Sequence, residues 1–467
     1  MDTLPAAILS AIRSAGQEHV LRFWDSLDGP SRTRLAGQLE GVDWPGLDRL
    51  RGLARGLSAG APPPGVAFDL AAAETPPCTT LDGDGAAGES LLAGGLVGAI
   101  LVAGGQGSRL GCAGPKGTVA VGPLSGDTLF ERLLGKLGGI RRRYGRAVPL
   151  AIMTSTATDA ETRAWLAAHG HCGLDPADVL VFRQRDLPAL DDRDSNLLLE
   201  APDRIALAPD GHGGLLPALV AAGGLGWFAD RGCRHVVTFQ VDNPLTMPLH
   251  PGFLGAHLRG HADFTTQVVR KREPQERVGV VVRDRERTFV VEYSDLPPHL
   301  AAERRPDGEL RFHAGSIAVH AFALDFLARA AATPDPLPLH LAHKAVPFVD
   351  ADGTRVQPRS PNAVKFERFV FDLMPLADRV VLVEIDPADG FAPLKNPPGA
   401  AADTLAHVHA AMDAFARRLL ARAGVAVAEG VSVELAPWIL DERDVGLLFP
   451  RGKRIDSATI VGGGAPG

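Results

Sequence analysis

The sequence predicts an α/β protein whose central domain is built on a mixed, mostly parallel β-sheet. Three observations carry this prediction: four apolar runs of strand length, helical patterns between them, and polar residues directly after each run. Continuous apolar runs are typical of strands buried on both faces, and their alternation with helices is typical of a parallel sheet. A helical N-terminal segment and a small C-terminal β module are expected to flank this domain.

The N-terminal segment, residues 1–90, is expected to be helical from residue 1 to about residue 60. Apolar residues recur at helical spacing between Ile8 and Trp24, and two further patterns cover residues 31–39 and 44–53. The stretch 58–65, "SAGAPPPG", breaks the helical pattern and indicates a linker. A second loose, Gly-rich stretch at 83–95 precedes the first strand.

The central domain is placed at residues 91–395. Its four apolar runs are "LVGAILVAG" (96–104), "VPLAIMTS" (148–155), "VLVFRQ" (179–184) and "HVVTFQVDN" (235–243), with a helical pattern at 159–169. The later stretches 277–284 and 287–296 predict two paired strands. In such sheets ligands bind at the carboxyl ends of the strands. The informative residues are therefore those that follow each run: 104–116, Ser155, Gln184 and Asp242.

The C-terminal part, residues 396–467, begins with a strong helical pattern at 402–423. The tail "VAVAEGVSVELAPWIL" (425–440) has the short apolar stretches and turn residues of a small β module.

Composition excludes several classes of protein. The formal net charge of −7 gives no general nucleic-acid footprint, and no apolar stretch approaches the roughly 20 residues that span a bilayer. The four cysteines are far apart and predict free thiols in a reducing compartment. The first residues lack the pattern of a signal peptide. We therefore expect a cytoplasmic protein with no membrane or nucleic-acid partner.

The stretch 101–117, "LVAGGQGSRLGCAGPKG", has the glycines of a phosphate-binding loop, and three kinds of loop compete for it. The dinucleotide fingerprint G-x-G-x-x-G fits imperfectly, because Gly111 comes one place late. The Walker pattern G-x-x-x-x-G-K-[ST] fails, because Lys116 precedes its glycine.

The nucleotidyltransferase pattern G-G-x-G-[ST]-R-L, followed by P-K, is complete. Its elements are Gly104, Gly105, Gly107, Ser108, Arg109, Leu110, Pro115 and Lys116. Glycines let backbone N–H groups approach a nucleotide closely, the arginine provides a rigid fork of donors for phosphate, and the lysine adds a mobile charge. This pattern favours a nucleoside triphosphate over a dinucleotide, so a dehydrogenase is disfavoured.

Further motifs extend the pattern along the chain. They are "AGQEHVLRFWDSL", "LAPDGHGGLLPAL", "TFQVDNPL", "VGVVVRD", "VVEYSDL", "FHAGSIAVH", "PNAVKFERFVFD" and "FAPLKN", between about residues 14 and 400. With them the sequence resembles the eukaryotic-type UDP-sugar pyrophosphorylases, most closely those that act on UDP-N-acetylhexosamines. The resemblance implies a Rossmann-like, GT-A-like nucleotidyltransferase domain. It also implies that UTP and a sugar 1-phosphate react to give a UDP-sugar and pyrophosphate, with Mg²⁺.

The resemblance assigns roles to particular residues. It implies catalytic roles for Arg109, Lys116 and Lys395. It implies contacts to UTP from Val102, Ala103, Gly104, Gly105, Lys116, Gln184, Gly211, Asp242 and Lys365. It implies contacts to the sugar or its phosphate from His212, Gly279, Glu292, Tyr293, Gly315, Ser316 and Lys395. Asp242 would hold Mg²⁺, and its place at the end of a buried strand suits this, because a carboxylate there is costly without a cation.

Two residues depart from the N-acetylhexosamine pattern. His212 stands where an asparagine is expected in "PDGNGG", and Ser316 stands for the asparagine of "NAGN". Both positions face the sugar in the family, so glucose or galactose 1-phosphate is an alternative substrate.

A catalytically idle nucleotide-sugar binding protein is the alternative of another class. The sequence favours a monomer without fixing the oligomeric state.

Overall fold

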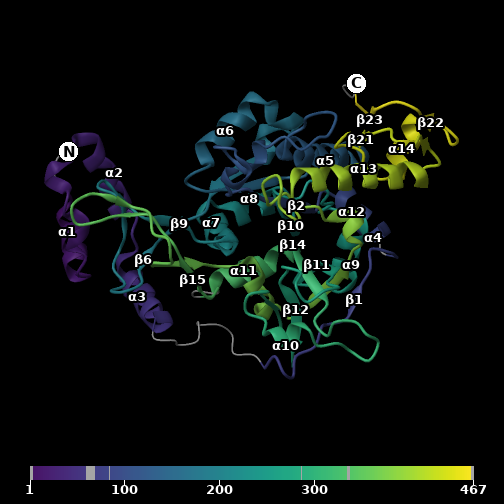
Figure 1. Ribbon diagram of the computed structural model, residues 1–467. Coiled ribbons are helices and arrows are strands. Elements are labelled where there is room, and N and C mark those ends of the chain that lie inside the picture. Colours follow the sequence, from purple (N-terminus) through teal and green to yellow (C-terminus); the bar gives the residue numbers. More distant parts are fainter. Residues whose placement is uncertain (1–3, 59–68, 84, 286, 334–336, 464–467) are drawn as a thin grey trace. The chain divides into compact units, whose positions relative to one another are not determined.

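The chain divides into two compact units in the computed structural model, which describes residues 4–58, 69–83, 85–285, 287–333 and 337–463 (Figure 1). The first unit contains Met1–Ala67, Gln184–Gly214 and Leu337–Val370, and the second contains Phe68–Arg183, Leu215–Pro336 and Phe371–Gly467. The N-terminal segment therefore packs with two later parts of the chain. The division into domains at residues 90 and 395 stays a prediction, and the expected linker at 58–65 lies, from residue 59 on, outside the described residues.

The first unit has the predicted helices at its start. They are α1 (Ala6–Ser14), α2 (Gly29–Glu40) and α3 (Trp44–Ser58), with short 3-10 turns at Glu18–Leu21 and Trp24–Ser26. Asp28 caps α2 by accepting a hydrogen bond from the N–H of Ser31. Apolar side chains of these helices share a core with strands from the two later segments, and Figure 1 shows the purple helices beside β6 and β15.

The strands of this unit are short. β15 (His340–Lys344), β18 (Ala363–Glu367) and β6 (Leu190–Asp191) form an antiparallel sheet. The remaining pairs are β5 (Asp186–Pro188) with β9 (Leu207–Pro209), β7 (Leu199–Ala201) with β8 (Arg204–Ile205), and β16 (Phe348–Val349) with β17 (Arg355–Val356).

The second unit is built on the predicted mixed, mostly parallel sheet. Its strands run in the order β1 (Cys78–Thr79), β19 (Val380–Glu384), β11 (Phe264–Arg270), β14 (Ala314–Ala323), β10 (His235–Gln240), β2 (Val97–Val102), β3 (Leu150–Thr154) and β4 (Val179–Arg183). Along this path only β14 is antiparallel to its neighbours. The hairpin of β12 (Val280–Asp284) and β13 (Arg287–Val291) joins the sheet through β14, and β2 and β3 are buried along their whole length.

Helices cover this sheet. They are α4 (Gly85–Ala93), α5 (Leu129–Tyr144), α6 (Asp159–Ala168), α7 (Leu215–Ala221), α8 (Gly224–Asp230), α9 (Pro251–Arg259), α10 (Pro298–Ala301), α11 (Leu324–Ala332) and α12 (Pro387–Gly390). α5 begins with a complete capping box, in which Thr128 and Glu131 bind each other's backbone N–H, and it ends at Gly145, whose φ is 69°. Its apolar face packs into the same core as β2 and β3.

The C-terminal module consists of α13 (Leu405–Arg422), β20 (Ala426–Val427), β21 (Val433–Leu435), α14 (Glu442–Leu448), β22 (Arg454–Ile455) and β23 (Thr459–Val461). The buried carboxylate of Glu434 on β21 attaches this module to the α/β domain. It accepts hydrogen bonds from the backbone N–H groups of Leu124 and Ser125, at 2.7 and 2.9 Å, and from the guanidinium of Arg132, at 3.2 Å. The module is therefore part of the second unit.

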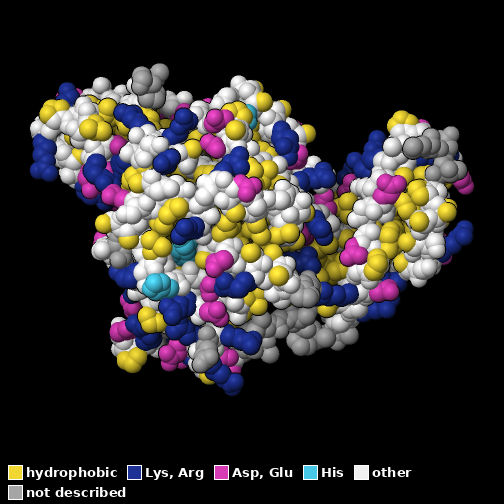
Figure 2. All heavy atoms as spheres, turned by 180° about the vertical axis from the view of Figure 1, so that it is seen from behind, with side chains coloured by type: hydrophobic (Ala, Val, Ile, Leu, Met, Phe, Trp, Pro, Cys, Tyr) yellow, Lys and Arg dark blue, Asp and Glu magenta, His cyan; other side chains and the backbone are white. Residues whose placement is uncertain are grey.

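The surface carries charges of both signs. Figure 2 shows Lys and Arg side chains interspersed with Asp and Glu on the visible face, in keeping with the modest net charge of −7. Within the described ranges, no single helix is both long and apolar enough to cross a membrane; the segments His212–Ala221 and Gly224–Asp230 meet that test only as a pair, which is bent by 70°.

Candidate functional site

The carboxyl ends of β2, β3 and β10 lie at one edge of the sheet. Val102 stands opposite Gln240 of β10 and Met153 of β3, because the three strands are parallel and in register. β14 is antiparallel and therefore begins at this edge. The glycine loop leaves the edge after β2, and the hydroxyl of Ser155, after β3, donates to the carbonyl of Gly104 at 2.7 Å. The polar residues that follow these strands thus converge.

The glycine loop folds back on itself. Gln106 and Pro115 form an isolated antiparallel bridge, and the N–H of Lys116 donates to the carbonyl of Gly105 at 3.0 Å. Gly111 takes the left-handed conformation, with φ of 77°, which costs glycine little and other residues more. Pro115 and Lys116 follow Gly105 by ten residues or more in the sequence. The fold of the loop therefore brings them close to the end of β2.

Four charged residues meet at this edge. The ammonium nitrogen of Lys116 lies 3.6 Å from a carboxylate oxygen of Asp242, and both side chains are mostly buried. Burial lowers the pKa of Lys116; the carboxylate of Asp242 opposes this, and the cations of Lys395 and Arg109 add to it. Arg109 and Lys395 thus lie near enough to Lys116 to act on its charge, and the group of three cations and one carboxylate has an excess of positive charge that suits a polyphosphate.

The loops that carry Asp242 and Lys395 are tied together. The carbonyl of Asp242 accepts a hydrogen bond from the N–H of Leu394, the residue before Lys395, at 2.8 Å. The buried side-chain amide of Asn243 donates to the carbonyl of Gly390 at 2.8 Å. Sequence reasoning did not single out Asn243; its signal is an amide placed directly after the acidic residue at the end of a strand.

A second cluster lies where β12, β13 and β14 meet. Gly279 precedes β12, its carbonyl accepts from the N–H of Ser316 at 2.8 Å, and a Cβ at Gly279 would lie 2.9 Å from Oε1 of Glu292. β12 pairs with β14 at Gly315. Tyr293 follows Glu292 and is 48% exposed. The structure therefore brings together five of the residues assigned to the sugar.

The remaining assigned residues belong to the first unit, and they are Gln184, Gly211, His212 and Lys365. Gln184 is buried directly after β4, Lys365 is half-buried in the middle of β18, and Gly211 has a φ of 81° in the loop after β9. A Cβ at Gly211 would lie 2.4 Å from the carbonyl oxygen of Arg368, so only glycine fits there. The action of these residues on the same substrates stays a prediction.

The side chain of His212 is held by the segment that follows β18. Its Nδ1 accepts a hydrogen bond from the N–H of Val370 at 3.1 Å, and its ring stacks on Phe369 with centroids 5.2 Å apart. Burial, with a smaller effect of His340, lowers the pKa of His212 to about 4. The imidazole is therefore neutral at pH 7 and carries its proton on Nε2.

Asp210, in the loop that contains His212, has a carboxylate in an unfavourable electrostatic environment. Its carboxylate is buried, neither oxygen has a hydrogen-bond partner among the residues that the structure describes, and the guanidinium of Arg368 is 4.0 Å away. Burial is the main cause that raises the pKa of Asp210 to about 7, and Arg368 counteracts it.

We expect Asp210 to make stability fall with rising pH. Because its folded-state pKa lies above the ordinary value of 3.8, its contribution is complete below about pH 4 and is lost as the pH rises through 7. Between pH 5 and 8 the free energy of unfolding should therefore drop by about 2 kcal/mol more in the native chain than in Asp210→Asn. Urea unfolding at several pH values measures this, and parallel pH profiles would refute it.

The acidic residues suit a cation that is shared with a substrate. Among the residues that the structure describes, no group of three or more His, Cys, Asp and Glu side chains is arranged to hold a metal. Mg²⁺ is commonly held by one or two carboxylates together with substrate phosphates, and Asp242 beside the glycine loop provides one such carboxylate. The residues present fit Mg²⁺ in that arrangement and not in an all-protein cage.

A glycine loop and a cluster of cations at the carboxyl edge of a mostly parallel sheet place this protein in the class of nucleotidyltransferases. Comparison with protein families gives the particular family: residues 75–414 match UTP–glucose-1-phosphate uridylyltransferase. The chain therefore belongs to the UTP–glucose-1-phosphate uridylyltransferase family.

Individual relatives agree with this family. A UDP-N-acetylhexosamine pyrophosphorylase-like protein 1 of Xenopus tropicalis is 41% identical over 315 residues, which are 66% of this chain and 61% of that protein. The UDP-N-acetylglucosamine pyrophosphorylase of Saccharomyces cerevisiae is 34% identical, over 79% of this chain and 78% of that protein. The crystal structure of the uridine diphosphate N-acetylglucosamine pyrophosphorylase from Trypanosoma brucei superposes with a TM-score of 0.78 and 24% identity, over 93% of this chain and 92% of that one, which shows the same fold.

Proposed function

We propose that this protein is an enzyme that transfers the uridylyl group of UTP to an N-acetylhexosamine 1-phosphate, releasing pyrophosphate. The observation that carries the proposal is the charge cluster at the end of the glycine loop, in which Lys116 pairs with Asp242 beside Lys395 and Arg109. The description of the family supplies UTP, and the names of the relatives supply the class of sugar. An idle binding protein would not need to keep all four charges.

The reaction is a single displacement at phosphorus. An oxygen of the sugar phosphate attacks the α-phosphorus of UTP, the bond to the α,β-bridging oxygen breaks, and pyrophosphate leaves with that electron pair. No protein atom forms a covalent bond. Lys116, Arg109 and Lys395 neutralise the two polyanions and align them, because two such anions repel each other strongly without cations.

The cofactor of the proposal is Mg²⁺. When bound, it would supply positive charge to the triphosphate. The carboxylate of Asp242, which lies 3.6 Å from the ammonium nitrogen of Lys116, would be its protein ligand. We also propose UTP and the sugar 1-phosphate as the partners, and the cytoplasm as the location, which the free cysteines in the described chain support.

Glucose 1-phosphate is the second candidate substrate, because Ser316 replaces the expected asparagine within the cluster that contains Glu292. A panel of the 1-phosphates of N-acetylglucosamine, N-acetylgalactosamine, glucose and galactose, each with UTP and Mg²⁺, tests the proposal. We expect the highest kcat/KM for an N-acetylhexosamine 1-phosphate. A strong preference for glucose 1-phosphate would overturn that choice of sugar and leave the uridylyl transfer in place.

We expect Ser316→Asn to increase the preference for N-acetylated sugars. An asparagine amide both donates and accepts, as the acetamido group does, and a matched pair of hydrogen bonds typically gives about 10-fold discrimination. The ratio of kcat/KM for N-acetylglucosamine 1-phosphate to that for glucose 1-phosphate should rise accordingly. The same ratio is measured for Ser294→Asn, a serine that follows the cluster and is exposed. An equal change in the two variants would contradict a specific role for Ser316.

A further inference from the structure

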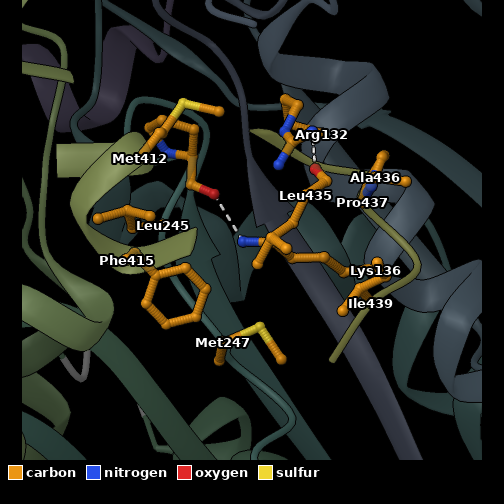
Figure 3. Close-up of a pocket in the computed structure, with 11 residues that line it drawn as sticks. Arg132, Lys136, Leu245, Met247, Met412, Phe415, Leu435, Ala436, Pro437 and Ile439 are labelled. Atoms are coloured by element: carbon orange, nitrogen blue, oxygen red, sulfur yellow. Dashed lines mark hydrogen bonds between the residues drawn. The ribbon is translucent and has the colours of Figure 1, made fainter. Parts of the chain in front are cut away.

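Lys136 is a buried lysine outside the charge cluster. It lies on α5, only 7% of it is exposed, and its ammonium nitrogen donates to the carbonyls of Pro244 and Thr246 at 2.6 and 2.7 Å. These carbonyls belong to the loop that follows β10, two and four residues after Asp242. In Figure 3 the side chain of Lys136 reaches across a small cavity toward this loop; the dashed line at its nitrogen marks the bond to Pro244, and the other dashed line marks the bond of Arg132 to Leu435.

The surroundings of Lys136 make its two bonds hard to replace. The cavity has a volume of about 20 Å³, room for about one water molecule, and its walls are mainly apolar. Met247, Met412 and Phe415 point into it (Figure 3). Burial, and then the charge of Arg132, lower the pKa of Lys136 well below its ordinary value. Burial of a lysine is costly unless its ammonium group is hydrogen-bonded, and here the two carbonyls of the loop provide those bonds.

Arg132 lies one helical turn before Lys136 but holds a different part of the fold. Its guanidinium donates to the carbonyl of Leu435 at 2.7 Å and pairs with the buried carboxylate of Glu434. Arg132 thus anchors the C-terminal module, whereas Lys136 anchors the loop of Asp242. The two residues share helix, face and burial, so they form a matched pair for experiment.

We propose that Lys136 is a positioning residue, which fixes the loop after β10 so that Asp242 meets a divalent cation on the UTP phosphates. The inference rests on the proposed function. Groups that orient a metal ligand from behind typically contribute 10- to 100-fold to metal affinity or activity, because a ligand displaced by about 1 Å binds poorly. In this role Lys136 touches neither substrate nor cation and acts through the backbone of residues 244–246.

The test measures UTP binding by calorimetry without sugar phosphate, so that no turnover occurs. The readout is the ratio of the dissociation constant in EDTA to that in Mn²⁺, which isolates the contribution of the cation. We expect Lys136→Met to lower this ratio about 10-fold or more. Arg132→Met should leave it within about 2-fold, even where it lowers the melting temperature as much. Lys136→Gln, which keeps a shorter donor, should fall between native and Lys136→Met, and it replaces Lys136→Met if that variant does not fold.

The outcomes separate the inference from the function on which it rests. If the Lys136 variants keep the native ratio of dissociation constants while Asp242→Asn lowers it strongly, the positioning role alone is overturned. An equal decrease in Lys136→Met and Arg132→Met would also overturn it, because the effect would then be general destabilisation. A native ratio in Asp242→Asn would instead remove the cation site from the proposed function.

Discussion

Replacement of Lys116 with alanine is expected to lower kcat for pyrophosphate release from UTP and a sugar 1-phosphate by about 100-fold or more. The ammonium group lies 3.6 Å from the carboxylate of Asp242, and in the proposed reaction it neutralises the charge that develops on the phosphates. Its loss removes a cation that is only 15% exposed, so water cannot take over its role. A coupled assay of pyrophosphate release measures the effect.

The fold should survive this change. Removing one partner of a largely buried ion pair costs about 3 kcal/mol or less here, because Lys395 and Arg109 remain as cations nearby, so the melting temperature of Lys116→Ala is measured and the assay is run below it. Lys453→Ala, which removes an exposed lysine from the C-terminal module, is the matched control and should keep native kcat. Near-native kcat in Lys116→Ala would show that this lysine does not act on the phosphates.

Asp242→Asn is expected to abolish the dependence of the rate on Mg²⁺ and to lower kcat/KM by about 100- to 1000-fold. The amide is nearly isosteric, and the backbone bond from Leu394 to Asp242 remains, but a neutral oxygen is a poor ligand for a hard cation. The measurement is the rate as a function of Mg²⁺ concentration. A saturation curve like that of the native chain would contradict the role of Asp242.

The matched control for this variant is Asp230→Asn. Asp230 is the last residue of α8 and is exposed, so its change removes one carboxylate without touching the charge cluster. Its Mg²⁺ dependence should be native. A similar loss in both variants would trace the effect to net charge rather than to the site.

The strands at the centre of the sheet could be predicted from the sequence, because burial on both faces makes them continuous apolar runs. β2, β3, β4 and β10 lie where those runs predicted them. β11, which reads "FTTQVVR", could not be predicted in this way, because its buried Thr265, Thr266 and Gln267 interrupt the apolar pattern. The hydroxyls of Thr265 and Thr266 form hydrogen bonds with the rings of His257 on α9 and His320 on β14, partners that the local pattern does not indicate.

The features of the fold that the sequence does not predict depend on contacts between residues far apart in the chain. The fully buried side chain of Gln17 accepts from the N–H of Leu197 and donates to Asn196, and thereby joins the N-terminal helices to a segment 180 residues later. Nothing in the local pattern indicates this pairing. The meeting of Lys116 and Asp242 was expected from the parallel order of their strands, whereas the part played by Lys136 has no signal beyond a single lysine in an amphipathic helix.

Uridylyl transfer at this site is tested most directly by following the α-phosphorus of UTP. The native protein is incubated with UTP labelled at that atom, N-acetylglucosamine 1-phosphate and Mg²⁺, and the products are separated. We expect the label to appear in UDP-N-acetylglucosamine and the pyrophosphate to be unlabelled. Tight binding of UTP with no labelled sugar nucleotide from any sugar 1-phosphate of the panel would contradict it and would identify a binding protein instead.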